Sequence, residues 1–581
     1  MRFLRMLTNS LVAGALGAAF LTILVLQLNP SVPLVSSTTW HLFAVLALFY
    51  GVHLAVLFYV LMVGRELIGL DAMSPGWVSV RVLAWLSAAS SAVASALMWF
   101  NVSGFSAALG ETAVRRMTAG AAATSATAVV LFGLAAAHYS FGRRGSRVGA
   151  GLLTIAVFGS LALPVAARGP GVADTAPAPL ATITDVALPV SGPRVVMLLL
   201  DGASFEYIWP RAASGRLPNF ARLIEMGASI DLATVRPTGP DPVWAAVATG
   251  MYPAKNGVRS PSEYFVRGDS RLLALLPDYC FSHVLVHLGL LLRESNSSAL
   301  LRARPLWSIL AAAGIPSGIV RWPLTSPAQP VHGFVLSDRF HQLLGSFLEL
   351  DRSAGYPSNL LPIARSAFAD AGLDSDADPV PAALDARPAS PEASAAMRDR
   401  AYSRAMHDLA AERPVQLSAI RYQSLDTAGH YNMRSTQPRE AGGANEEERR
   451  RRLQMFDRYY SDIDGEVGDA ISRLLPGDLL LVVSGFGMQQ PSTVKRILAR
   501  ILRDPMSGTH ERAPDGFLLA YGTAVEPGRH QRGSIVDVTP TVLYFLGLPV
   551  GRDMDGYARP DLFHSSFTAG RPIAFVPTHN R

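Results

Sequence analysis

The sequence is poor in cysteine and in charged residues. Its 581 residues include a single cysteine, Cys280, so no disulfide can form within it and no zinc site can be built from clustered cysteines. Only 17% of the residues are charged while 50% are hydrophobic, and the mean hydropathy is +0.25. These values exclude an intrinsically disordered chain and are unusual for an ordinary soluble protein.

A net positive charge is also lacking outside one region. The formal net charge is +6, and residues 1–167 carry all of it, with nine arginines against two glutamates and one aspartate. Basic and acidic residues cancel over residues 168–581. Because the surplus lies in the most hydrophobic third of the chain, it indicates membrane topology, and no nucleic-acid surface is evident.

Five long apolar stretches lie in residues 1–167, each close to the ~20 residues that cross a bilayer. They cover residues 10–28, 41–63, 82–102, 117–137 and 148–167. The first resembles a signal peptide, but four further stretches follow it and no small-residue cleavage site precedes Asn29-Pro30. We therefore expect about five transmembrane helices in residues 1–167, with the lipid bilayer as partner.

The arginines predict the orientation of these helices. With the N-terminus in the cytoplasm, the inner segments carry seven arginines and the outer loops carry only Arg115 and Arg116. This bias follows the positive-inside rule, and an odd number of helices then places the rest of the chain outside the cytoplasm. Residues 168–192 are rich in proline, alanine and glycine, which is typical of an extended linker.

Residues 193–581 alternate short apolar runs with amphipathic helices. Apolar runs at 195–200, 317–321, 415–424, 479–484 and 516–521 predict strands, and helical patterns separate them. Such alternation favours a doubly wound α/β domain with a mostly parallel sheet. Residues 262–303 and 340–392 break the alternation, and we expect them to be insertions that cover the carboxyl edge of the sheet.

Residues that directly follow the predicted strands are candidates for chemistry, because ligands bind at the carboxyl ends of such strands. Asp426 and His430 lie four apart on a predicted loop, where Gly429 permits a tight bend, and His510 follows later. Two histidines, one carboxylate and an open fourth position make a catalytic zinc site. For Asp201, and for the Asp426–His430 pair alone, a turn or helix cap is the alternative interpretation.

Three segments carry a resemblance to a known family. They are VVMLLLDGASFEYIWPRAASGRLPNFARLIEMGA, PTGPDPVWAAVATGMYPAKNGV and IVDVTPTVLYFLGLPVGRDMDG. Together they resemble the alkaline phosphatase superfamily, most of all its type I phosphodiesterase/nucleotide pyrophosphatase branch. This resemblance implies an alkaline-phosphatase-like fold and two metal ions, usually zinc, on either side of a threonine or serine nucleophile. It assigns Asp426, His430 and His510 to one metal and Asp201 to the other.

The sequence departs from that family at the second metal and at the nucleophile. The family's Ser-Asp-His-Gly motif reads Ser484-Gly485-Phe486-Gly487, so two ligands are missing. The nucleophile position, four residues before Trp244, is Pro240, and the nearest hydroxyl belongs to Thr238, a displaced candidate. Because a hydroxyl is not readily activated without the second metal, we expect one zinc ion, Asp201 as a remnant, and weak or no hydrolysis ahead of full activity.

Three functions remain open at this point. In the first alternative, the chain is a membrane-anchored hydrolase of phosphoester or phosphodiester substrates that works with one metal or rearranged ligands. Alternatively, it is a non-catalytic relative that serves as a binding or scaffold module. The third alternative is a lipid-headgroup phosphotransferase, because five membrane helices followed by an external domain of this superfamily resemble the layout of phosphoethanolamine and phosphoglycerol transferases.

Overall fold

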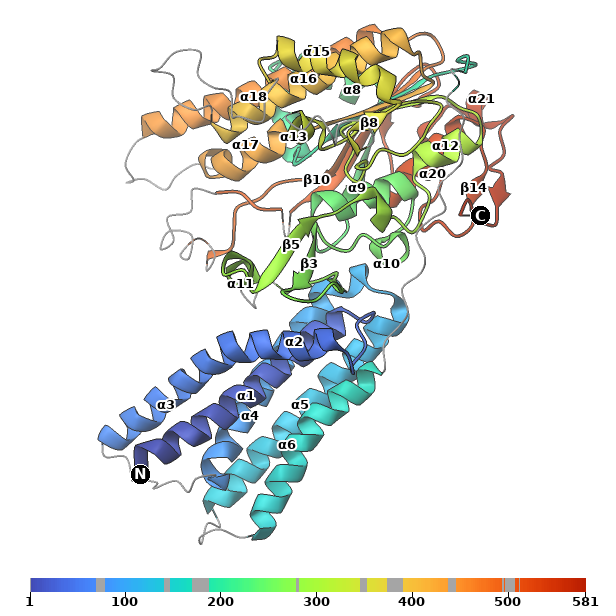
Figure 1. The fold of residues 1–581 in the computed structure, drawn as a ribbon. Helices are drawn as coiled ribbons and strands as arrows, with labels where there is room; N and C mark the ends of the chain where they lie inside the picture. The colour runs from blue at the N-terminus through green and yellow to red at the C-terminus, as the bar shows by residue number, and fades with distance from the viewer. Residues whose placement is uncertain are drawn as a thin grey trace. The chain divides into compact units, whose positions relative to one another are not determined.

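The structure is a computed structural model that describes most of the chain (Figure 1). It covers residues 2–68, 79–140, 147–169, 186, 188–277, 282–344, 353–373, 390–436, 446–493, 496, 507–510 and 513–580. The chain divides into two compact units, one of Met1–Thr175 with Ser262–Ser295 and one of Ala176–Pro261 with Asn296–Arg581. Cys280 and most of the predicted linker lie outside the described residues.

Within its described residues, the first unit contains five helices that are long and apolar enough to cross a membrane, as the sequence predicts. Helix α1 (Arg2–Leu28) passes close to α3 (Val52–Leu67) and to the π-helical turn before it, since a Cβ atom on Gly14 would lie 2.3 Å from the carbonyl oxygen of Gly51 in that turn and 3.1 Å from Cβ of Ala55 in α3. Small residues at such crossings are typical of membrane helices. The elements are α1 (Arg2–Leu28), α2 (Ser37–Leu46) continued by a π-helical turn (Ala47–Gly51) into α3 (Val52–Leu67), α4 (Val80–Phe105), α5 (Glu111–Ser140) and α6 (Arg147–Arg168).

Residues 262–295 belong to the first unit although they interrupt the second unit in the sequence. They form an antiparallel sheet of β4 (Leu272–Leu273), β3 (Ser262–Val266) and β5 (Leu291–Ser295), with α11 (Ser282–His287). Asn29 at the end of α1 joins this segment to the helices. Its Nδ2 donates to the carbonyl of Leu275 (2.8 Å) and its Oδ1 accepts from the amide of Leu275 (3.0 Å).

The second unit is built on a ten-stranded sheet. Its five central strands, β10, β1, β9, β6 and β7, are parallel. Strand β11 runs antiparallel to both β10 and β2, and β8 runs antiparallel to β7, while β2 pairs in parallel with β12 and β13. This arrangement confirms the predicted mostly parallel α/β fold. Its order is β12 (Gly528–Arg529), β2 (Ala228–Ala233), β11 (Asp515–Tyr521), β10 (Leu479–Phe486), β1 (Val195–Leu200), β9 (Leu417–Tyr422), β6 (Ser317–Val320), β7 (Gly333–Leu336) and β8 (Gly355–Tyr356), and β13 (Gly533–Ser534) pairs with β2.

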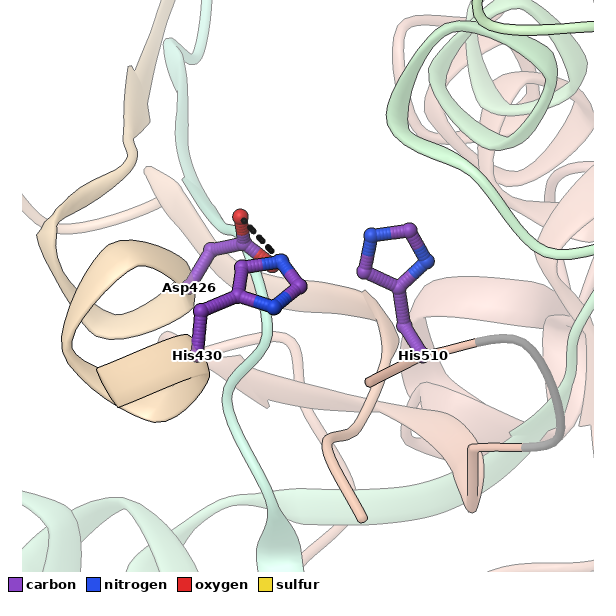
Figure 2. A group of neighbouring side chains, drawn as sticks. All are labelled: Asp426, His430 and His510. Atoms are coloured by element: carbon purple, nitrogen blue, oxygen red, sulfur yellow. Dashed lines mark ion pairs between the residues drawn. The ribbon is translucent and has the colours of Figure 1, made fainter. Parts of the chain in front are cut away.

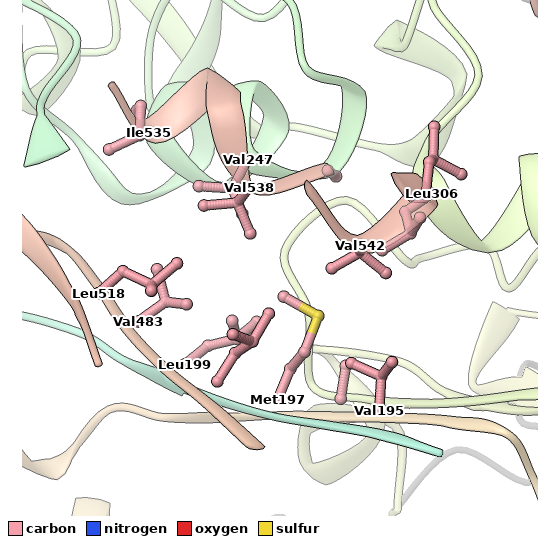
Figure 3. Packing of buried hydrophobic residues seen from close by; sticks show 14 of the residues in the cluster. Val195, Met197, Leu199, Val247, Leu306, Val483, Leu518, Ile535, Val538 and Val542 are labelled. Atoms are coloured by element: carbon pink, nitrogen blue, oxygen red, sulfur yellow. The ribbon is translucent and has the colours of Figure 1, made fainter. Parts of the chain in front are cut away.

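Helices cover both faces of this sheet, which explains why strand β1, VVMLLL, is apolar at every position. Val195, Met197 and Leu199 of β1 point into one apolar cluster (Figure 3), and Leu198 and Leu200 point into the other. The first cluster includes α9 (Pro240–Thr249), α12 (Leu306–Ala312) and α20 (Val538–Phe545). The second includes α7 (Phe205–Ala213), α8 (Pro218–Met226), α15 (Leu361–Asp370), α16 (Pro391–Glu412) and α18 (Glu446–Ser472).

The predicted insertion at 340–392 is described in part. Its residues form α13 (Phe340–Leu343), strand β8, which extends the sheet beside β7, and helix α15, which contacts α16. Of the insertion, residues 345–352 and 374–389 lie outside the described part of the chain. The insertion therefore contributes a strand to the edge of the sheet as well as helices.

Candidate metal centre

Asp426, His430 and His510 come together in the second unit (Figure 2). One ligand atom from each lies within 4.8 Å of the other two, and His430 Nε2 lies 3.6 Å from Asp426 Oδ2. The prediction that Asp426 and His430 lie on a loop is wrong, because both are on helix α17 (Ser424–Asn432). Residues four apart share one face of a helix, so their spacing alone brings the two side chains together.

The start of α17 is fixed by a buried acidic side chain. Asp399 accepts hydrogen bonds from the backbone amides of Gln423 (3.1 Å) and Ser424 (2.9 Å), which have no partner inside the helix. Asp399 is in turn paired with the buried guanidinium of Arg321. These contacts hold the first turn of α17, and with it Asp426, at the carboxyl end of β9.

The two imidazoles are oriented by backbone carbonyls. Nδ1 of His430 lies 2.9 Å from the carbonyl oxygen of Gly508, and Nδ1 of His510 lies 3.1 Å from that of Thr238. Because a carbonyl only accepts, each Nδ1 carries the hydrogen and each Nε2 keeps a lone pair. Contacts of this kind orient the histidine ligands of metal ions in proteins.

Asp426 supplies a buried carboxylate of which one oxygen, Oδ1, has no hydrogen-bond partner among the described residues. Burial raises the pKa of this carboxyl, whereas His430 and His510 lower it. Gly202 allows the close approach of Asp426, because its φ is +66° and a Cβ would lie 2.8 Å from the Asp426 Cα. An orphaned oxygen and two imidazole nitrogens fit a divalent cation with an open coordination position.

Asp201 lies beside Asp426 at the end of β1, but its carboxylate is fully engaged. The indole nitrogen of Trp244 donates to Oδ1, and Arg421 donates to Oδ2 through both Nε (2.8 Å) and Nη2. Asp201 is completely buried and Arg421 is 6% exposed. The predicted remnant of a second metal site is therefore occupied by a buried ion pair.

Arg421 is the residue of this region that the sequence analysis did not consider. It lies on the central strand β9 opposite Leu199 of β1. Burial lowers its pKa, but Asp201, Asp241 and Asp338 raise it by more, so the group stays charged. A single arginine within an otherwise apolar strand, LSAIRY, was the available signal.

Two further carboxylates lie near this ion pair. Asp241, in the first turn of α9, accepts a hydrogen bond from Nδ2 of Asn296 (2.9 Å). Loss of hydration and the neighbouring Asp338 raise the pKa of Asp241 to about 7, against the opposing charge of Arg421. Loss of hydration also raises the pKa of Asp338.

Apolar packing fills Gly485 and Phe486, the two positions at which the family resemblance leads us to expect an Asp-His pair. A Cβ on Gly485 would lie 2.2 Å from Cγ1 of Val243, so no larger side chain fits there without a shift. Phe486 is fully buried in the core, with its ring centroid 5.2 Å from that of His510. Neither position has space or chemistry for a second metal, so the residues present do not fit one.

Thr238, the displaced hydroxyl, lies next to the cation site. Its Oγ1 donates to the carbonyl of Val235 (3.0 Å), while its own carbonyl accepts from His510. Pro240 begins helix α9 two residues later, which its fixed φ favours. Thr238 thus contacts a ligand through its backbone, and its hydroxyl is held in a turn.

A family of known proteins matches the part of the chain that contains this site. The family model described as "Type I phosphodiesterase / nucleotide pyrophosphatase" matches residues 195–534. No curated protein matches. The structure of human ectonucleotide pyrophosphatase/phosphodiesterase 5 is similar, with 14% identity and a TM-score of 0.38. The murine protein is similar with 13% identity and a TM-score of 0.36, and its inactive variant in complex with AMP with 13% identity and a TM-score of 0.37. All three cover 64% of this chain and 100% of their own.

Proposed function

Because the chain belongs to the type I phosphodiesterase/nucleotide pyrophosphatase family, we propose that its second unit binds one divalent cation and a phosphoester, and hydrolyses the phosphoester slowly or not at all. The observation that carries this proposal is the contrast between the two halves of the site. One ligand atom from each of Asp426, His430 and His510 lies within 4.8 Å of the other two, whereas Asp201 is paired and Gly485 and Phe486 are packed.

Zinc is the proposed cation, since two imidazoles and one carboxylate with an open position are the donor set of catalytic zinc sites. A bound zinc ion supplies Lewis-acid polarisation of a phosphoryl oxygen. The chain itself supplies the geometry, because the carbonyls of Gly508 and Thr238 orient the imidazoles and Asp399 holds the helix of Asp426.

Among the described residues of the site, none supplies the activated nucleophile that rapid hydrolysis requires. The position that the family resemblance assigns to the nucleophile is a proline, Pro240. The Thr238 hydroxyl donates its hydrogen bond to the Val235 carbonyl and not to a base. Arg421 offers one positive charge near this position, but a guanidinium does not deprotonate in proteins and so cannot serve as a base. These features support a slow hydrolase or, as the second candidate, a non-catalytic phosphoester-binding module.

Hydrolysis of bis(p-nitrophenyl) phosphate by the full-length protein in detergent tests this proposal. We expect turnover below the ~1 per second at which ordinary enzymes begin, with any residual rate lost on chelation and in His430→Ala. Thr238→Ala, with Thr238→Ser as its matched control, tests whether a residual rate uses the displaced hydroxyl. Turnover within ~1–1000 per second that His430→Ala abolishes would overturn the slow-hydrolase proposal.

We further propose that the five apolar helices anchor the protein in a membrane and that the second unit lies outside the cytoplasm. The distribution of arginines among the connecting segments supports this orientation. A phosphatase reporter fused after Pro170 should be active only if that point is outside the cytoplasm. Activity of a cytoplasm-specific reporter at the same point would contradict the orientation.

A further inference from the structure

Arg421 is a buried, positively charged side chain of the described site region to which the proposed function assigns no task. It lies on a central strand, is nearly inaccessible, and binds Asp201 Oδ2 through two nitrogens. Its positive charge also acts on Asp241 and Asp338, two further carboxylates of this region. A buried arginine among three carboxylates is costly to assemble, so its charge is expected to have a function beyond packing.

The position of this charge is informative. Asp201 is the residue that the family resemblance assigns to a second metal, and it is the residue that Arg421 neutralises. The other ligand positions for that metal are closed by Val243 and Phe486. Asp241 and Asp338 would leave an oxygen-rich, negatively charged environment behind if the guanidinium were absent, and such an environment attracts hard divalent cations.

We propose that Arg421 is a built-in substitute for the second cation of a two-metal site. Its guanidinium balances the charge of Asp201 and keeps further cations out, so the site holds at most the ion at Asp426, His430 and His510. Unlike a metal ion, the guanidinium has no open coordination position and accepts no ligand. This inference rests on the proposed function for its explanation of slow hydrolysis, but its test depends only on a change in cation binding.

The test compares Mn²⁺ binding by zinc-saturated, full-length protein and its variants at about pH 8, measured by electron paramagnetic resonance. Arg421→Ala removes the charge and is expected to bind one more Mn²⁺ per chain than the wild type does. We expect the affinity of this additional site for Mn²⁺ to be at least about 100-fold higher than the affinity of the same site in the wild type. This factor follows from the interaction of charges a few ångströms apart inside a protein. Arg421→Lys keeps a tethered cation and is expected to behave as the wild type does.

A second variant covers the case in which Arg421→Ala does not fold by itself. If Mn²⁺ restores the folding of Arg421→Ala, the ion has replaced the guanidinium and the inference stands. The double variant Asp201→Asn/Arg421→Met leaves no unpaired charge at Asp201, and the Trp244 indole can still donate to the new amide oxygen. It is expected to fold without Mn²⁺ and to gain no Mn²⁺ site.

Three results would overturn the inference. These are an Arg421→Ala protein that folds but binds no additional Mn²⁺, one that stays unfolded at millimolar Mn²⁺, and a double variant that binds Mn²⁺ as tightly as Arg421→Ala. The outcome is separable from the proposed function, because the comparison concerns the difference between variant and wild type. If the wild type bound no zinc, the proposed function would fail while the gain of one Mn²⁺ would still support the inference.

Discussion

Gly485 stands where the family resemblance leads us to expect a metal ligand, and even the smallest side chain there should be destabilising. In Gly485→Ala, the new Cβ would lie 2.2 Å from Val243 Cγ1 and 3.9 Å from the nearest carbon of Trp244. The preferred distance between such carbons is about 3.5–4.0 Å, so Val243 or the backbone must move by more than an ångström. Val243 is fully buried, and overpacking of this kind costs about 1–3 kcal/mol.

A double-mutant cycle with Val243→Ala separates this clash from other effects. Val243→Ala alone removes two buried methyl groups and should cost about 1.5–2 kcal/mol. In Gly485→Ala/Val243→Ala the clash is gone. The loss in free energy of unfolding in this double variant should therefore be about 1–3 kcal/mol smaller than the sum of the losses in the two single variants. The assay is guanidinium-induced unfolding of the full-length protein in detergent, followed by tryptophan fluorescence. Gly485→Ala with wild-type stability, or additive costs in the cycle, would refute this reasoning.

Three further predictions follow from the same geometry. Gly202→Ala should weaken zinc binding at least about tenfold, because φ is +66° and the added Cβ would press on the Asp426 backbone; competition with a chelator measures this, and unchanged affinity would contradict it. The contribution of Asp241 to the free energy of unfolding should fall as pH rises from about 4 to about 7. In the folded protein the pKa of Asp241 is about 7, so its carboxyl keeps a proton that the unfolded chain releases near pH 4. Unfolding measured across this pH range should lose that contribution in Asp241→Asn. Asn29→Ala should expose residues 262–295 to limited proteolysis, since both backbone groups of Leu275 lose their partner, and an unchanged cleavage pattern would argue against this role.

Much of the fold could be predicted because its signals are local. Val195–Leu200 is a continuous apolar run that the structure shows as β1 with the same bounds, and the five apolar stretches lie within the five long helices. Strand β2, Ala228–Ala233, was missed because it alternates apolar and polar residues over a short span beside the antiparallel part of the sheet. The assignment of residues 262–295 to the first unit also depends on contacts with distant residues such as Asn29, which no local pattern reveals.

The candidate site divides in the same way. The spacing of Asp426 and His430 was visible in the sequence, but the helix beneath them was not, because Gly429 suggested a turn and Asp399, which caps the helix, lies far away in the sequence. Gly429 instead makes room for Met488, whose side chain would meet a Cβ at 3.0 Å. Arg421 was missed because its role depends on its ion pair with Asp201, which follows the neighbouring strand β1 and lies far from Arg421 in the sequence.

The most direct test of the central claim is the zinc content of the full-length protein after equilibrium dialysis against buffered zinc. The account predicts about one zinc ion per chain, since Asp426, His430 and His510 with one open position complete a single site. His430→Ala should reduce this content to near zero, whereas Thr238→Ser, which keeps the backbone carbonyl that orients His510, should leave it unchanged. Two ions per chain, or one ion that persists in His430→Ala, would contradict the account.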